Sequence, residues 1–186
     1  IIAGSTWPRD EKILARAFYH SLVYNNFKIV VVPHNIDKSS MRKTIKRFKK
    51  YALIYSELHK ATEADLIGKR VLIIDTIGML NALYQYADVN YIGGGFNKGI
   101  HNTLEAAVYG KPLIIGPKYK KFDEAVGLVN TNAALVIRSD DDLLNRTNLM
   151  NQFKFIYTGA GSDAEKFIQS HLGGTETVVR YIKTIV

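Results

Sequence analysis

The sequence contains no cysteine, so the protein can form neither a disulfide bond nor a metal site built on thiolates. It has no apolar run near the ~18 residues that a membrane-spanning helix needs. No two histidines have the H-x-x-x-H spacing that is typical of zinc sites. The acidic run Asp140–Asp142 is better suited to the positive end of a helix than to a cation. We therefore expect no metal site.

What the sequence does have is enough chain for one domain, residues 1–186, with the apolar content of a globular protein. Its net charge of +8 comes partly from a basic segment at 41–50. Met41, Ile45, Phe48 and Ala52 recur there at helical spacing, which predicts an amphipathic helix with a basic outer face. A solvated face is the favoured interpretation; contact with an anionic membrane surface is the alternative. Nucleic-acid binding is not expected, because aromatic and basic residues do not interleave.

Short apolar runs alternate with helical patterns along the chain. The expected strands are Ile1–Gly4, Lys28–Val32, Ala52–Tyr55, Val71–Ile74, Val89–Ile92, Leu113–Ile115 and Ala134–Ile137. One helix is expected from Pro8 to Asn25-Asn26, and a second after a cap at Ser39 or Ser40. Further helices are expected over Gly78–Tyr86, over Lys121–Asn130 and from Asp140–Asp142, while Glu57–Lys69 is expected to be a connection. Beyond Leu143 the chain is mostly helical, with a capping box at Ser162–Glu165 and a break at Gly173-Gly174. This alternation predicts an α/β fold, a Rossmann-like parallel sheet flanked by helices.

In such folds ligands lie outside the carboxyl ends of the strands. The segment from Gly93 to Pro117 contains the most informative of these ends. A strand enters three glycines, and a helix follows whose first turn carries His101, Asn102 and Thr103 and which ends at Gly110. Glycines allow close approach of a ligand, and a helix N-terminus favours a phosphate. The spacing is neither G-x-G-x-x-G nor a Walker loop, so the glycines alone are equally typical of a tight turn.

The wider set of motifs resembles the 3-deoxy-D-manno-octulosonic acid (Kdo) transferase family. The similar segments are Ala3–Thr6 with Asp10-Glu11, Ile74–Gly78, Leu83-Tyr84, Ala87-Asp88, Gly93–Phe96, Gly99–Ala106, Gly110–Pro112, Gly116-Pro117, Phe122 and Glu124-Ala125. They occur in the family's order over residues 3 to 125, and the tail is only loosely similar.

The resemblance implies the C-terminal half of a GT-B glycosyltransferase. It implies a single nucleotide-sugar domain over residues 1–186, a fragment that lacks an N-terminal acceptor domain, and the chain's start within a strand agrees. The donor substrate would be CMP-Kdo, with no cofactor, and the acceptor a lipid A precursor held by the missing domain. The full-length enzyme would act in lipopolysaccharide biosynthesis at the cytoplasmic face of the bacterial inner membrane, while this fragment would be soluble. The general base is expected on the missing domain, so no catalytic residue is assigned here and the chain alone should transfer no sugar.

The donor-binding residues follow from the same resemblance. They are Gly4, Ser5, Thr6, His34, Ile77, Gly78, Gly94, Gly95, Phe96, Asn102, Thr103 and Glu105. Glu105 would accept hydrogen bonds from the ribose, and Ile77 and Gly78 would lie against the cytosine. Helix capping is an equally good interpretation of Ser5, Thr6 and Asn102 taken singly, and of Asp75.

Relatives often read His-Pro-Glu-Arg where this chain has Pro33–Asp37, so the arginine is missing. Lys38 or Arg42 could supply the cation instead. Lys98, inside the glycine loop, could approach an anionic ligand, but a solvated loop lysine explains it equally well. His20, His59 and His171 are expected to be structural or at the surface.

Three other functions are compatible with the sequence. The first is a GT-B glycosyltransferase that uses a UDP- or GDP-sugar. The second is a basic module that binds acidic lipid or nucleic acid through Arg42–Lys50. The third is a nucleotide-sugar epimerase, which shares the doubly wound architecture.

Overall fold

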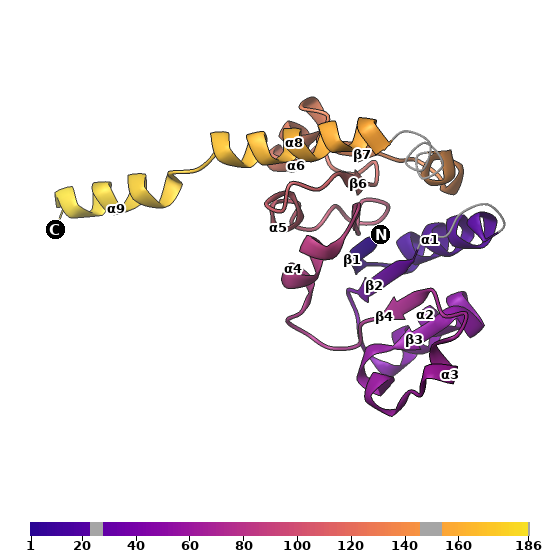
Figure 1. Cartoon of the computed structure of the whole chain (residues 1–186). Helices are drawn as coiled ribbons and strands as arrows, with labels where there is room; N and C mark the ends of the chain where they lie inside the picture. The colour runs from indigo at the N-terminus through magenta and orange to yellow at the C-terminus, as the bar shows by residue number, and fades with distance from the viewer. Residues whose placement is uncertain (23–27, 146–153, 186) are drawn as a thin grey trace.

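The computed structural model describes residues 1–22, 28–145 and 154–185 (Figure 1). Within them a parallel sheet has the strand order β3-β4-β2-β1-β5-β6-β7. The strands are β1 (Ile2–Thr6), β2 (Ile29–Pro33), β3 (Ala52–Ile54), β4 (Val71–Ile73), β5 (Asn90–Ile92), β6 (Leu113–Ile115) and β7 (Ala134–Val136). Every predicted strand is confirmed, and its ends agree with the prediction to within two residues. Apolar runs between polar turns suit strands that are buried on both faces.

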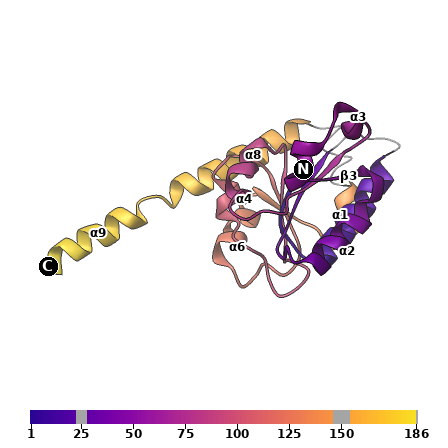
Figure 2. The same ribbon diagram turned by 90° about the horizontal axis from the view of Figure 1, so that it is seen from below.

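Helices cover both faces of the sheet (Figure 2). They are α1 (Pro8–Ser21), α2 (Lys38–Phe48), α3 (Glu63–Leu66), α4 (Leu80–Leu83), α5 (Leu104–Ala107), α6 (Asp123–Asn130), α8 (Lys154–Ser170) and α9 (Gly174–Ile185). Short 3-10 turns are η1 (Lys49–Tyr51), η2 (Tyr55–Lys60) and η3 (Tyr84–Tyr86), and residues 140–145 are also helical. None of these described helices combines the length and the apolar character needed to cross a bilayer.

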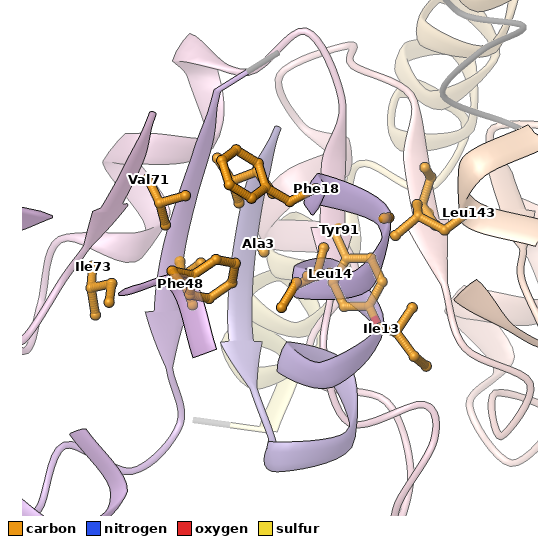
Figure 3. Packing of buried hydrophobic residues seen from close by; sticks show 14 of the residues in the cluster. Ala3, Ile13, Leu14, Phe18, Phe48, Val71, Ile73, Tyr91 and Leu143 are labelled. Atoms are coloured by element: carbon orange, nitrogen blue, oxygen red, sulfur yellow. The ribbon is translucent and has the colours of Figure 1, made fainter. Parts of the chain in front are cut away.

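Side chains that alternate along the strands form two cores. Ala3, Val31 and Tyr91 face α1 and α2, where Leu14, Phe18 and Phe48 pack against them (Figure 3). Ile2, Ile92 and Ile115 face the other layer, which contains α5, α6 and α8. Both layers are needed because the side chains on both faces of the sheet are mostly apolar.

The predicted amphipathic helix at 41–50 is confirmed as α2, with two differences. Its N-cap is Asp37, not Ser39 or Ser40: the Asp37 carboxylate accepts hydrogen bonds from the backbone N–H groups of Ser39 (2.9 Å) and Ser40 (3.1 Å). Arg47 does not belong to the solvated basic face, since its guanidinium forms an ion pair with Glu11 of α1. The two side chains are only 17% and 4% exposed, so this pair links α1 to α2.

The C-terminal part follows the prediction only in outline. Ser162–Glu165 is not a capping box, because it lies inside α8. The break at Gly173-Gly174 is confirmed, and α9 extends away from the sheet (Figure 1). The helix start at Asp140 is also confirmed; the Ser139 hydroxyl accepts from the Asp142 N–H (3.1 Å). The predicted helix end at Asn25-Asn26 lies outside the described residues.

Candidate functional site

Parallel strands bring the predicted site residues to one edge of the sheet. The strand order reverses between β1 and β5, since β2 lies on one side of β1 and β5 on the other. Ligands of open α/β sheets bind at this kind of switch point. The segments at that edge are Ser5–Trp7, which ends β1 and leads out of it, and the glycine loop, Gly93–Gly99, after β5.

Asp10 holds these two segments together. Its buried carboxylate accepts hydrogen bonds from the N–H groups of Trp7 and Gly94 (both 2.9 Å) and from the Tyr91 hydroxyl (2.7 Å). One side chain therefore caps α1 and fixes the start of the glycine loop. The sequence indicated Asp10 as one of the two acidic residues of a family-like motif, but not its contacts. Two of its three contacts, Tyr91 and Gly94, lie 81 and 84 residues away along the chain, which no local pattern reveals.

The glycine loop is tightly packed. Gly94 has φ +91°, a conformation that favours glycine. A Cβ on Gly95 would lie 2.7 Å from the Gly116 Cα, so the loop after β5 and the turn after β6 touch through their backbones. The Gly94 N–H is used by Asp10 and is not available to a ligand. Phe96 packs in the core at 5% exposure, with the Arg9 guanidinium 5.4 Å from its ring centre.

The last residues of β1 follow a strained backbone path. Ser5 has φ +50°, which is uncommon for a residue other than glycine. Neither Ser5 nor Thr6 caps α1, so the capping interpretation is wrong for both. The N-cap residue is Trp7, and the Asp10 carboxylate accepts a hydrogen bond from its backbone N–H. The buried Thr6 hydroxyl forms no hydrogen bond of ordinary geometry within the described residues, although it lies near Glu11. Gly4 serves packing: a Cβ there would clash with the Tyr84 hydroxyl and Leu80.

Three rings gather at the same edge. His34, just after β2, stacks on Trp7 with ring centres 4.5 Å apart and lies 4.6 Å from the ring of His101. The Trp7 indole N–H donates to His101 Nε2 (2.9 Å), which requires that nitrogen to be unprotonated. Burial and the neighbouring His34 lower the pKa of His101, although Asp10 and Glu105 oppose them. The sequence indicated His34 and His101 but missed Trp7, whose only signal is its position after a strand.

The motif helix is shorter than predicted. α5 spans only Leu104–Ala107, so His101 and Asn102 precede it and Thr103 is its N-cap residue. The Asn102 side chain accepts from the Leu104 N–H (3.0 Å), which supports the capping interpretation, and it also donates to Glu105 Oε1 (3.1 Å). Within the described residues the backbone N–H groups of Asn102 and Thr103 have no protein acceptor. A pair of free donors and an oriented carboxylate thus lie next to each other.

The loop after β4 contains Ile77 and Gly78. Ile77 is 88% exposed and Gly78 has φ +94°. The predicted helix Gly78–Tyr86 begins later, at Leu80, and continues as η3. Asp75 does not cap it: its carboxylate accepts hydrogen bonds from the backbone N–H (3.0 Å) and hydroxyl of Ser56, which anchors η2.

The remaining basic residues do not converge on these groups. Lys38, Arg42 and Lys98 are exposed. Lys118 bonds the glycine loop from outside, with Nζ 2.7 Å from the Asn97 carbonyl oxygen. His171 packs on Phe167, while His20 and His59 are exposed, as the sequence predicts. No group of His, Asp and Glu in the described parts of the chain has the arrangement of a metal site.

No protein-family model matches the chain. The 3-deoxy-D-manno-octulosonic acid transferase of Rickettsia prowazekii (strain Madrid E) is 29% identical over 160 residues, which is 81% of this chain and 33% of that protein. The chain spans about a third of the length of such relatives. These similarities confirm the resemblance to Kdo transferases that the motifs predict.

Solved structures confirm the fold. The C-terminal CMP-Kdo binding domain of WaaA from Acinetobacter baumannii aligns with a TM-score of 0.78 at 21% identity, over 90% of this chain and 88% of that one. A glycosyltransferase from Rickettsia africae ESF-5 aligns with a TM-score of 0.66 at 11% identity, over 98% of this chain and 46% of that one. The predicted C-terminal GT-B architecture is therefore correct.

Proposed function

We propose that the chain is the donor-binding domain of a Kdo transferase and that it binds CMP-Kdo at the switch point between β1 and β5. One observation carries the proposal: segments far apart in sequence bring Ser5, His101 and the Asn102–Glu105 pair to this edge. The sequence relatives, which are named Kdo transferases, support the choice of donor.

The phosphate of CMP would lie against the free N–H groups of Asn102 and Thr103 and the hydroxyl of Ser5. When the bond between the sugar and the phosphate oxygen breaks, negative charge grows on that phosphate. Oriented N–H groups and hydroxyls stabilise such charge without a metal ion. The short α5 contributes little dipole, so these local donors carry the interaction rather than a long helix.

The ribose would lie at Glu105. Asn102 holds one carboxylate oxygen, Oε1, and leaves Oε2 to accept from ribose hydroxyls. The exposed backbone at Ile77 and Gly78 provides a surface for the cytosine. His34 and His101 would face the departing sugar, since they lie beside the β1 end. Gly94, Gly95 and Phe96 would act by shaping the loop, because they are buried.

The intact enzyme would transfer Kdo to a lipid A precursor at the cytoplasmic face of the inner membrane. The acceptor hydroxyl must lose a proton as it attacks, and the general base would belong to a further, acceptor-binding domain. We propose that residues 1–186 form only the donor domain and transfer no sugar alone, and that the exposed basic face of α2 supports contact with an anionic membrane surface.

Isothermal titration calorimetry with CMP tests the proposal. Glu105→Ala and Asn102→Ala should each weaken binding about tenfold, which is the loss of one charge-assisted hydrogen bond. Lys60→Ala, far along the chain and exposed, is the matched control and should bind as the parent does. UMP should bind more weakly than CMP. Equal affinity for UMP would favour a different nucleotide sugar, and no binding of either at millimolar concentration would refute the proposal.

A further inference from the structure

A concave surface lies between α1 and the segment that follows β7. This groove has a volume of about 650 Å³. Its cationic lining residues are Arg9, Lys12, Arg16, Arg47 and Arg138. They come from α1, α2 and the loop after β7, so the positive charge is produced by tertiary structure and not by one basic run.

Only part of this charge is neutralised. Arg16 pairs with Asp140 (3.1 Å), and Arg47 pairs with Glu11. In residues 1–22, 28–145 and 154–185, no carboxylate lies within ion-pair distance of the side chains of Arg9, Lys12 or Arg138. Three of the five lining cations therefore have no ion-pair partner within the described structure, although the Asp142 carboxylate accepts a hydrogen bond from the Arg138 backbone N–H (2.7 Å). Like charges held together in a concavity raise the local concentration of anions.

A neutral donor adds to the cations. Tyr19 lines the groove, and its buried hydroxyl makes no hydrogen bond to any described residue. Burial raises the pKa of Tyr19, so the hydroxyl stays protonated and can donate. A buried polar group without a partner costs free energy, and a ligand oxygen would recover it only if the Tyr19 side chain turned its hydroxyl, which is closed to solvent in this structure, towards the groove.

We propose that this groove binds the phosphate group of an anionic ligand, separately from the nucleotide site. Guanidinium groups match phosphate oxygens with paired donors, and three unpaired cations suit a dianion better than a single carboxylate. The phosphate belongs either to a free phosphorylated compound or to a lipid headgroup. One end of the groove adjoins the glycine loop, because Arg9 lies over Phe96.

The experiment compares two double variants that each remove two positive charges. Lys12→Ala/Arg138→Ala changes the groove, where both side chains are exposed and have no carboxylate partner. Lys60→Ala/Lys183→Ala changes exposed positions outside the groove. Inorganic phosphate is titrated at constant ionic strength, and vesicles of phosphatidylcholine with and without phosphatidylglycerol are tested by sedimentation.

We expect the groove variant to bind phosphate at least about tenfold more weakly, while the control variant binds as the parent does. Phosphate binding in solution identifies a free phosphorylated compound. Binding only to phosphatidylglycerol vesicles, lost in the groove variant, identifies a headgroup. Equal weakening in both variants, or no binding of either probe by the parent, overturns the proposal. Lys12→Gln/Arg138→Gln repeats the test if the alanine variant is unstable, and unchanged CMP binding separates this result from the nucleotide site.

Discussion

Among single residues, Asp10 has the widest influence on the site. It is fully buried, and its three hydrogen bonds join α1, β5 and the glycine loop. Because the carboxylate faces only donors, an amide in its place would turn an N–H₂ group towards at least one of them.

Asp10→Asn should lower the free energy of unfolding by about 3 kcal/mol, since buried donors lose their acceptor. Tyr91→Phe removes one of these bonds and should cost only about 1 kcal/mol. Urea unfolding followed by circular dichroism measures both. Equal stability of Asp10→Asn and the parent would show that the carboxylate does not organise this edge.

His101 should make stability depend on pH. Its pKa in the folded protein lies below the usual 6.5, chiefly through burial. Below pH 6.5 the unfolded chain takes up a proton that the folded protein does not, so stability falls with falling pH until the folded-state pKa is passed. His101→Gln keeps an acceptor for Trp7 but does not titrate.

The melting temperature of the parent should therefore drop more between pH 7.5 and pH 5.5 than the melting temperature of His101→Gln. These two pH values lie about one unit above and below the usual histidine pKa. Burial raises the pKa of Glu11, and its contribution acts in the opposite direction in both proteins. The difference between the two proteins isolates His101. If the melting temperatures of the two proteins fell equally with pH, His101 would not have the lowered pKa. His59→Gln, at an exposed position, is the control and should behave as the parent does.

Residue roles could be predicted from the sequence only where a short motif carries them. Asn102 and Glu105 are three positions apart and were recognised together. The contacts of Trp7 and Asp10 were not predicted, because their partners His101 and Tyr91 are close only in the folded chain. Whether the recognised residues bind CMP stays a prediction.

At the scale of elements, strands were easier to predict than helices. A buried strand such as Leu113–Ile115 is fully apolar and bounded by turn residues, so its ends are readable. Helices α4 and α5 are each one turn long, which leaves no helical period to recognise. The basic helix was predicted, but the direction of Arg47 depends on Glu11 of another helix.

Two glycines in α8 allow a matched test of helix packing. Gly159 has open space around its Cα, whereas a Cβ on Gly161 would clash with the Gly110 carbonyl oxygen. Gly159→Ala should stabilise the protein by about 0.5–1 kcal/mol through helix propensity. Gly161→Ala should destabilise it by about 1–3 kcal/mol through overpacking.

Thermal unfolding of the two variants provides the comparison. Both changes add one methyl group to the same helix, so propensity cancels between them. Changes of the same sign would show that α8 does not pack against the turn at Gly110.

For the whole molecule, the sheet and its two helical layers are one unit, and α9 is not part of it. No residue of α9 is buried, and Val178, Tyr181 and Ile185 are exposed. Figure 1 shows this helix leading away from the sheet. The sequence predicted a helix there but not its separation from the core, because an apolar stripe is typical of packed helices too.

Deleting residues 174–186 should therefore change the free energy of unfolding by no more than about 0.5 kcal/mol, as expected for a segment without packed contacts. CMP binding should also be unchanged. Guanidinium chloride unfolding of the shortened and full chains measures the free energy of unfolding. A decrease of several kcal/mol in the shortened chain would show that α9 supports the core.

A crystal structure of the chain with CMP is the strongest test that one nucleotide site lies where the sheet order reverses. We expect the phosphate within hydrogen-bond distance of the Asn102 and Thr103 N–H groups, and the ribose hydroxyls at Glu105. CMP bound elsewhere, such as in the groove between α1 and Arg138, would contradict it.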